Sequence, residues 1–266
     1  MPKTPDDFVF FWKPDGPNGW AGQWYSSPFT VRVALPAPQG DGDADGAREG
    51  EERDVYFPTA EHWMMAQKAL LFGDREIFER VVSLPGSSSS PSSSSTSAAG
   101  PGPTRNTRSR PSKAVSPSNS NSNSNAKGAG GRAPRAPSPK EVKALGRKVK
   151  NFDDETWVRE RGRIVLEGSL HKFRQNPQLR RELFGTGERE LVEASPLDRI
   201  WGIGLGEKKA RETCGSDAQG GKGWGLNLLG KALVEARAIL REEFKAEEEE
   251  GQKEEAGDHG DASSSG

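Results

Sequence analysis

The stretch VYFPTAEHWMMAQKALLFG, residues 55–73, decides how the rest of the chain folds. It begins with residues typical of a strand, continues through Pro58 and the helix-capping residue Thr59, and ends at Gly73, so it predicts a short strand followed by a helix. Apolar side chains point in nearly every direction around that helix. They are Trp63, Met64, Met65, Ala66, Ala69, Leu70, Leu71 and Phe72. We therefore expect a buried helix at the centre of the domain.

Two charged residues interrupt this apolar surface. Glu61 and Lys68 lie on one stripe of the helix, about 10 Å apart along its axis. A buried charge needs a partner, because leaving it uncompensated costs several kcal/mol. One interpretation is structural, with an ion pair or a glutamate that complements the helix dipole. The other is a pocket wall that carries an acid and an amine.

The composition indicates one domain that is interrupted by low-complexity segments. Of the 266 residues 32% are hydrophobic, the mean hydropathy is −0.82 and the formal net charge is −1, which favours neither a polyanion nor a membrane partner. The apolar deficit is local to Gly-, Ser-, Asn- and Glu-rich blocks. We expect a domain over residues 8–244, disordered insertions at about 36–54, 86–138 and 207–222, and a disordered acidic tail at 245–266.

Hydrophobic periodicity and turn residues predict a mainly α-helical domain with a small β-sheet, an α+β fold. Expected strands are 8–12, 29–35, 55–57 and 190–194. Expected helices cover 75–82, 139–149, a long segment from Asp153 or Asp154 to Asn176, 178–184 and about 226–244. Ser138 and Glu141 form a capping box before the second of these helices.

Several classes of function are disfavoured. The single cysteine, Cys214, excludes an internal disulfide and a cysteine-based metal site, and the three histidines are too dispersed in sequence to suggest one. Phosphate-loop and nucleophile-elbow motifs are absent from the sequence. We expect no metal or other cofactor, no membrane partner, and a cytoplasmic or nuclear location. Nucleic acid is expected to contact the chain weakly at most, through the basic residues of the 86–138 insertion.

Six short motifs, in this order, resemble the NADAR or YbiA-like N-glycosidase family. They are Phe10-Phe11-Trp12, Ser27-Pro28-Phe29, Phe57 to His62 with Ala66-Gln67-Lys68, Leu145-Gly146-Arg147, Asp198 to Gly202, and Gly225 to Gly230. Each motif is weak alone, but the ordered set covers most of the chain outside the insertions. The segment 23–29 departs from the Ser-Asn-Phe-like segment of bacterial members, at what would be the mouth of the substrate site.

The resemblance implies a compact, mainly helical domain that hydrolyses an N-glycosidic bond. Bacterial and plant members act on the first ribosylaminopyrimidine phosphates of riboflavin synthesis, and other members remove ADP-ribose from guanine bases. Cleavage of a ribosyl–nitrogen bond builds positive charge on C1 and needs help for the leaving nitrogen or the attacking water, which carboxylates supply. The expected catalytic residues are therefore Glu61 and Asp198, with Lys68 as a Schiff-base or phosphate-holding amine.

The expected substrate-binding residues come from the same motifs, together with Trp24, which lies outside them. Arg147 suits a phosphate through its bidentate fork, and Trp201 or Trp24 suits stacking on a base. Gln67 and Asn227 also stand at motif positions. Four of the expected site residues have a structural alternative. Arg147 would cap carbonyls, Trp201 would fill the core, Asp198 would cap a turn, and Asn227 would orient a loop.

Three functional hypotheses remain open at this point. The first is a metal-independent N-glycosidase acting on a phosphorylated ribosylaminopyrimidine. The second is a hydrolase that releases ADP-ribose from a modified base or protein. The third is a noncatalytic module that binds a nucleotide-like ligand and joins a complex through its basic insertion and acidic tail.

Overall fold

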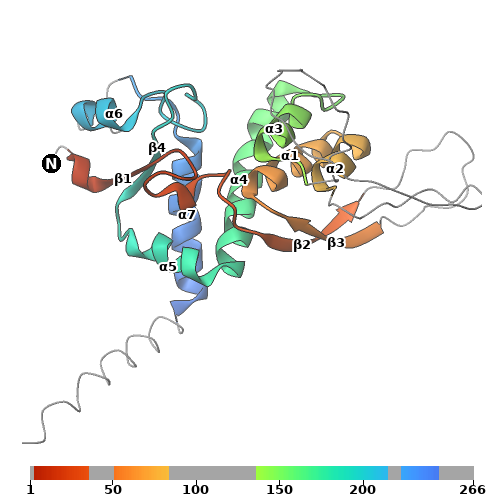
Figure 1. Cartoon of the computed structure of the whole chain (residues 1–266), viewed down its shortest axis with the longest axis horizontal. Helices are drawn as coiled ribbons and strands as arrows, with labels where there is room; N and C mark the ends of the chain where they lie inside the picture. Colours follow the sequence, from red (N-terminus) through yellow and green to blue (C-terminus); the bar gives the residue numbers. More distant parts are fainter. Residues whose placement is uncertain (1–2, 36–50, 84–135, 215–222, 246–266) are drawn as a thin grey trace, which may run out of the picture. The chain divides into compact units, whose positions relative to one another are not determined.

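The computed structural model describes residues 3–35, 51–83, 136–214 and 223–245. The expected insertions lie for the most part outside these ranges, as does the tail beyond residue 245. The described part of the chain confirms the mainly α-helical class, with two small two-stranded sheets in place of one (Figure 1).

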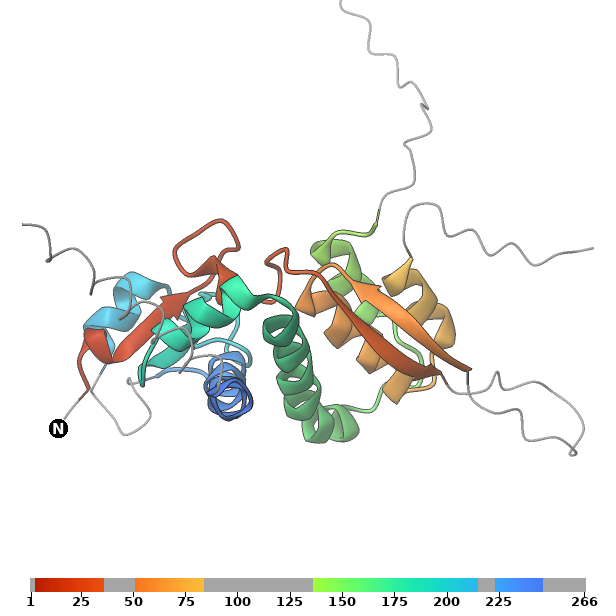
Figure 2. The ribbon, with the colours of Figure 1, turned by 90° about the horizontal axis from the view of Figure 1, so that it is seen from below.

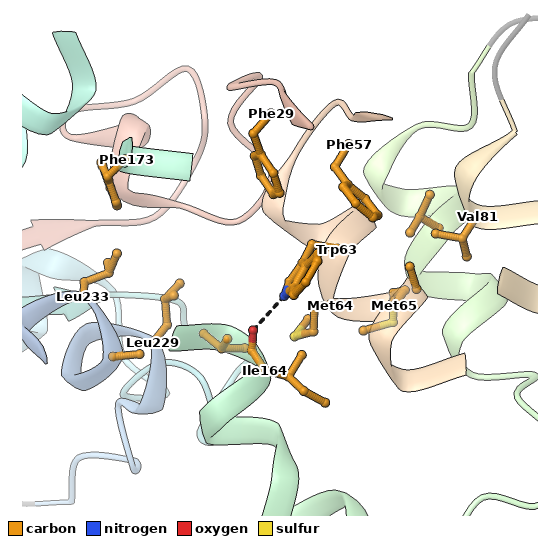
Figure 3. Packing of buried hydrophobic residues seen from close by; sticks show 14 of the residues in the cluster. Phe29, Phe57, Trp63, Met64, Met65, Val81, Ile164, Phe173, Leu229 and Leu233 are labelled. Atoms are coloured by element: carbon orange, nitrogen blue, oxygen red, sulfur yellow. Dashed lines mark hydrogen bonds between the residues drawn. The ribbon is translucent and has the colours of Figure 1, made fainter. Parts of the chain in front are cut away.

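The helix α1, Ala60–Leu71, is buried over most of its length, as its sequence predicts. Trp63 is its main anchor: the indole packs edge-on against Phe57, with 5.3 Å between ring centroids, and its Nε1 donates a 2.8 Å hydrogen bond to the carbonyl of Ile164 (Figure 3). Gly73 follows the helix with φ +71°, the left-handed conformation that suits glycine after a helix end. The core therefore fixes both the position and the rotation of α1.

An antiparallel hairpin precedes α1. Strand β2, Phe29–Leu35, pairs with β3, Glu51–Phe57, in a register that sets Phe29 opposite Phe57. The start of β3 corrects the expected insertion, which included residues 51–54. These residues look like a polar loop because they carry the charges of an outer sheet face, where Arg32 pairs with Glu52 and Asp54 across the strands.

The second sheet joins two strands that are far apart in the sequence. Strand β1, Phe8–Phe11, runs parallel to β4, Glu190–Glu193, and all four β1 residues are buried. The strand is covered on both faces, which explains its continuous apolar run. Parallel pairing places the carboxyl ends of both strands at the same edge, so the residues after Phe11 and the end of β4 lie together.

Further helices pack against α1, against β4 or against one another. They are α2, Arg75–Val82, α3, Pro139–Gly146, α4, Asp154–Gln175, α5, Pro177–Gly185, and α7, Leu228–Glu243. The long helix α4 contacts α1 on one side and α7 on the other, and α7 contacts β4 (Figures 1 and 2). The capping box at Ser138 is present at the start of α3, as the sequence predicts.

A short helix replaces part of the third expected insertion. Helix α6, Glu207–Thr213, lies in the segment expected to be disordered from 207 to 222. Its buried residue Ala210 packs in a small apolar cluster with Phe8 and Phe10, and Arg211 pairs with Glu207 along the helix. One buried alanine among charged residues gives too weak a periodic signal to reveal a helix.

Candidate active site

A cavity of about 450 Å³ opens where the carboxyl ends of β1 and β4 meet the first turn of α1 and one face of α3. Segments that are distant in sequence form its wall, including the loop before β2 and the loop after β4. The lining residues are Trp12, Lys13, Pro14, Gly22, Gln23, Trp24, Glu61, Met64, Lys143, Arg147, Glu193, Ser195, Leu197, Asp198 and Trp201.

Glu61 is a buried acid in the lining of this pocket. It stands in the first turn of α1, where its backbone N–H donates 3.1 Å to the carbonyl of Gln23, and only 2% of its surface is exposed. Burial raises the pKa of its carboxyl group to about 7, while attraction to Lys143 and hydrogen bonding from the Trp24 side chain oppose the rise. This carboxyl group can therefore hold or release a proton near neutral pH.

Glu193 is a second acid in the same pocket, and the sequence analysis does not identify it. It is the last residue of β4, and its backbone N–H donates 3.1 Å to Oδ1 of Asn227. Burial raises the pKa of its carboxyl group to about 7; Asp198 and, more weakly, Glu61 add to the rise, and Lys143 opposes it. The signal that points to Glu193 is its place at the end of a parallel strand, which requires knowledge of the β1–β4 pairing.

Unpartnered polar atoms concentrate in this pocket. Among the residues that the structure describes, the buried side-chain oxygens without a hydrogen-bond partner are Oε1 of Gln23, Oε1 of Glu61 and Oε2 of Glu193. All three residues line the same cavity. Buried polar groups in folded proteins are nearly always paired, so such a cluster marks a place where the protein holds polar groups ready for a ligand.

Basic residues from α3 form another part of the wall. Lys143 and Arg147 are four positions apart, so both project from the same side of the helix into the pocket lining. Lys143 is half-buried, and Arg147 is the C-cap residue of α3 and is exposed. Together they offer an ammonium and a guanidinium group to an anionic ligand.

Three tryptophans complete the lining. Trp12 and Trp24 are about two-fifths exposed, and Trp201 is partly buried. The Nζ atom of Lys143 lies 5.9 Å from the ring centroid of Trp24. Exposed indoles in the pocket lining offer flat faces on which a planar base can stack.

Asp198 has two roles in the structure. Its Oδ1 accepts hydrogen bonds from the backbone N–H groups of Ile200 at 2.9 Å and Trp201 at 2.8 Å, so it caps the turn after β4. It also lines the pocket and raises the pKa of both glutamates through its charge. The structural interpretation of Asp198 and its place in the site are therefore compatible.

Glycines before and after α6 allow neighbouring segments of backbone to pack closely. A Cβ on Gly202 would lie 2.6 Å from the carbonyl oxygen of Glu193, and one on Gly225 would lie 2.4 Å from that of Arg199. The close approach that these glycines allow is therefore to neighbouring chain segments, which holds the loop against β4.

Three of the expected site residues do not line the pocket. The ammonium group of Lys68 lies over the rings of Phe152, at 4.1 Å, and Trp157, at 5.2 Å, and burial lowers its pKa. Gln67 lies half-buried on α1, outside the lining. Asn227 is the N-cap residue of α7, and its side chain bridges the carbonyl of Leu191 and the N–H of Glu193. Asn227 therefore contacts the backbone of Glu193 and is not part of the cavity lining.

The two histidines within the described ranges take part in hydrogen bonding and packing of the core. His62 accepts a 2.8 Å hydrogen bond from the Thr59 hydroxyl at Nδ1 and donates a 2.9 Å bond from Nε2 to the carbonyl of Pro137; this assignment follows because a carbonyl can only accept. His171 packs against Trp63, and His259 lies outside the described residues. Within the described ranges no group of three or more His, Cys, Asp or Glu residues is placed to hold a metal ion, and no helix there is long and apolar enough to span a membrane.

Comparison with known proteins identifies similar chains. The sequence matches the NADAR domain over residues 10–110 and 123–241. It is 33% identical to an N-glycosidase of Acanthamoeba polyphaga mimivirus, over 71% of this chain and 76% of that protein. It is 34% identical to an N-glycosidase of Nostoc punctiforme, over 40% of this chain and 58% of that protein. It is 30% identical to a riboflavin biosynthesis protein of Vibrio vulnificus, over 41% of this chain but a quarter of that protein.

Among solved structures, the chain aligns with the NMR structure of the Escherichia coli protein YbiA. That alignment has a TM-score of 0.47 and 19% identity, and it covers 91% of this chain and 88% of the other.

Proposed function

Because this chain belongs to the NADAR domain family, we propose that it is a hydrolase that cleaves an N-glycosidic bond. Two relatives that carry the name N-glycosidase support this activity, and one of them aligns over most of both chains. The reaction is assigned to the pocket between the strand ends and α3. The observation that carries this assignment is the pair of buried acids, Glu61 and Glu193, each with a pKa near 7.

A pair of this kind provides an acid and a base together. Two neighbouring carboxyl groups that titrate near pH 7 and repel each other as anions hold about one proton between them at that pH. In the proposed reaction the protonated member gives its proton to the leaving nitrogen, and the C1–N bond breaks. The ionised member takes a proton from water as the C1–O bond forms. The carboxylate of Asp198 adds negative charge near the developing positive charge on the ribosyl ring.

The proposed substrate is a phosphorylated ribosylaminopyrimidine. Lys143 and Arg147 would hold its phosphate, and Trp24 or Trp201 would stack on its base. The phosphate role first expected of Lys68 passes to Lys143, because Lys143 lines the pocket and Lys68 does not. The name of the Vibrio vulnificus relative is consistent with a substrate from riboflavin synthesis.

A substrate comparison tests this proposal. Purified protein is incubated with 5-amino-6-ribosylaminouracil 5′-phosphate and, separately, with ADP-ribosylated guanosine, each with and without a chelator. We expect release of ribose 5-phosphate from the first substrate at equal rates in both conditions. Release of ADP-ribose from the second substrate alone would replace the proposed substrate with an ADP-ribosyl one. Hydrolysis of neither substrate, with binding of both, would favour the noncatalytic alternative.

A further inference from the structure

Lys172 is buried in the described structure without a carboxylate partner. It lies near the C-terminal end of α4 with 2% of its surface exposed, and burial lowers the pKa of its amine to about 7. Its Nζ donates hydrogen bonds to two carbonyl oxygens, of Trp20 at 2.6 Å and of Gly22 at 3.1 Å. A buried amine is costly, and an apolar side chain of similar volume would avoid that cost.

The two carbonyls belong to the segment that forms the pocket wall. Gly22, Gln23 and Trp24 all line the cavity, and Gln23 contributes one of its unpartnered oxygens. The carbonyl of Gln23 accepts the backbone N–H of Glu61. The segment is therefore held on one side by Lys172 and on the other by the first turn of α1. This arrangement fixes the backbone from which the side chains of Gln23 and Trp24 project.

Two neighbouring residues, Gln175 at the end of α4 and its C-cap Asn176, hold the chain farther from the pocket. Gln175 exchanges two hydrogen bonds with the backbone of Thr30, at 2.9 and 2.8 Å, and Asn176 donates 3.1 Å to the carbonyl of Pro28. None of these hydrogen bonds involves a residue of the cavity lining. Gln175 thus provides a matched comparison: it lies on the same helix and makes the same number of backbone hydrogen bonds, outside the site.

We propose that Lys172 is a positioning residue for the active site, which orients Gln23 and Trp24 by holding the carbonyls of Trp20 and Gly22. The part of this proposal that concerns catalysis rests on the function proposed above. The part that concerns the pocket wall does not. Holding two carbonyl oxygens requires two N–H donors at the end of a long apolar side chain. The lysine amine supplies two donors whether it is charged or neutral.

Amide hydrogen exchange of Lys172→Met and Gln175→Leu tests the structural part without a substrate. In the wild type, the N–H groups of Ala21 and Gly22 are hydrogen-bonded within the segment. We expect exchange in residues 20–25 to rise about tenfold or more in Lys172→Met and to stay unchanged in Gln175→Leu. Unchanged exchange at 20–25 in folded Lys172→Met would overturn the proposal. If that variant does not fold, Lys172→Gln takes its place. Its shorter side chain should hold the two carbonyls only in part, so exchange at 20–25 should rise less than tenfold and still exceed that of Gln175→Leu, and a rate equal to that of Gln175→Leu would overturn the proposal.

Steady-state kinetics test the catalytic part. We expect kcat/KM of Lys172→Met to fall about tenfold or more, chiefly through a higher KM, because the stacking wall is displaced. Lys172→Gln should recover part of the loss, and Gln175→Leu should remain within about twofold of the wild type. Faster exchange with unchanged kinetics would overturn the catalytic part. Inactivity of the wild-type protein itself would contradict the proposed function, and the exchange experiment would still decide the role of Lys172.

Discussion

Single residues explain why the pocket is chemically unusual. Glu61 and Glu193 come from the start of a helix and the end of a strand, and each has one buried carboxylate oxygen without a partner. In a protein selected only for stability, such groups would be paired or replaced, because ionising them in a buried site costs free energy. The cost is concentrated at the residues to which we assign the reaction.

Glu193→Gln should therefore stabilise the protein, and more so at high pH. The folded-state pKa of Glu193 is raised from 4.5 to about 7, so between these values the unfolded chain releases the proton that the folded chain keeps. The free energy of unfolding falls over this window and levels off above pH 7. We expect Glu193→Gln to gain about 2–3 kcal/mol over the wild type at pH 8 and little at pH 4.

Urea denaturation at the two pH values measures this gain. Glu190→Gln is the matched control, because Glu190 lies on the same strand but pairs with Lys3 at the surface, where removing an ion pair costs about 1 kcal/mol or less. A gain for Glu193→Gln that is equal at pH 4 and pH 8 would contradict the account of its burial.

The sequence identifies the individual site residues unevenly. Glu61, Asp198, Arg147, Trp24 and Trp201 all line the pocket as placed by the structure, and their roles there stay predictions. Lys68 shares a helical stripe with Glu61 by its spacing, but two turns separate them, and its long side chain ends between aromatic rings. Periodicity gives the direction in which a side chain leaves its helix. It does not give the cavity that the side chain reaches.

At the scale of elements, the contact between α1 and α4 is the one on which the site depends most. α1 carries Glu61, and α4 carries Lys172. The two helices meet at Gly168, where a Cβ would lie 2.4 Å from Cδ1 of Trp63. The Trp63 indole cannot move away without cost, because it packs on Phe57 and its Nε1 donates a hydrogen bond to the carbonyl of Ile164.

Gly168→Ala should lower the free energy of unfolding by about 1–3 kcal/mol, because it overpacks this contact. Gly162, on the same helix, has open space where its Cβ would lie, so Gly162→Ala should raise the free energy by about 0.5–1 kcal/mol. Urea denaturation of both variants measures the difference. Equal effects of the two alanines would show that α1 and α4 do not approach as closely as described.

Elements were predictable where the local signal was strong. α2 spans 75–82 as expected, and α1 is buried because its apolar residues surround the helix. The start of β3 at Glu51 and the helix α6 were missed because their exposed faces are charged and few of their residues are buried. In such segments tertiary contacts outweigh the local pattern.

At the scale of the molecule, the site exists because β1 pairs with β4. Phe11 lies opposite Glu193, so the residues after β1 and the end of β4 meet at the sheet edge that lines the pocket. Nothing in either strand alone specifies the partner or the parallel direction. The sequence could therefore predict the class of fold and several residues that line the pocket, while the assembly of the pocket required the structure.

The low-complexity insertion should be dispensable for hydrolysis. α2 and α3, which flank it in sequence, contact each other in the fold. Replacing residues 86–135 by a linker of about eight Gly and Ser residues should raise the free energy of unfolding by about 1–2 kcal/mol, because the loop to be closed is shorter. Thermal denaturation and the hydrolysis assay measure the two effects. Loss of activity with an intact fold would assign the insertion a part in catalysis.

The most direct test of the proposed active site is the initial rate of ribose 5-phosphate release by the wild type and Glu61→Gln. The substrate is 5-amino-6-ribosylaminouracil 5′-phosphate, and Glu76→Gln, an exposed glutamate in the first turn of α2, is the control. We predict that Glu61→Gln lowers kcat by about 10²–10⁴-fold while its melting temperature stays at or above that of the wild type. Glu76→Gln should keep wild-type turnover. Turnover by Glu61→Gln at the wild-type rate would contradict the assignment of Glu61 to the reaction.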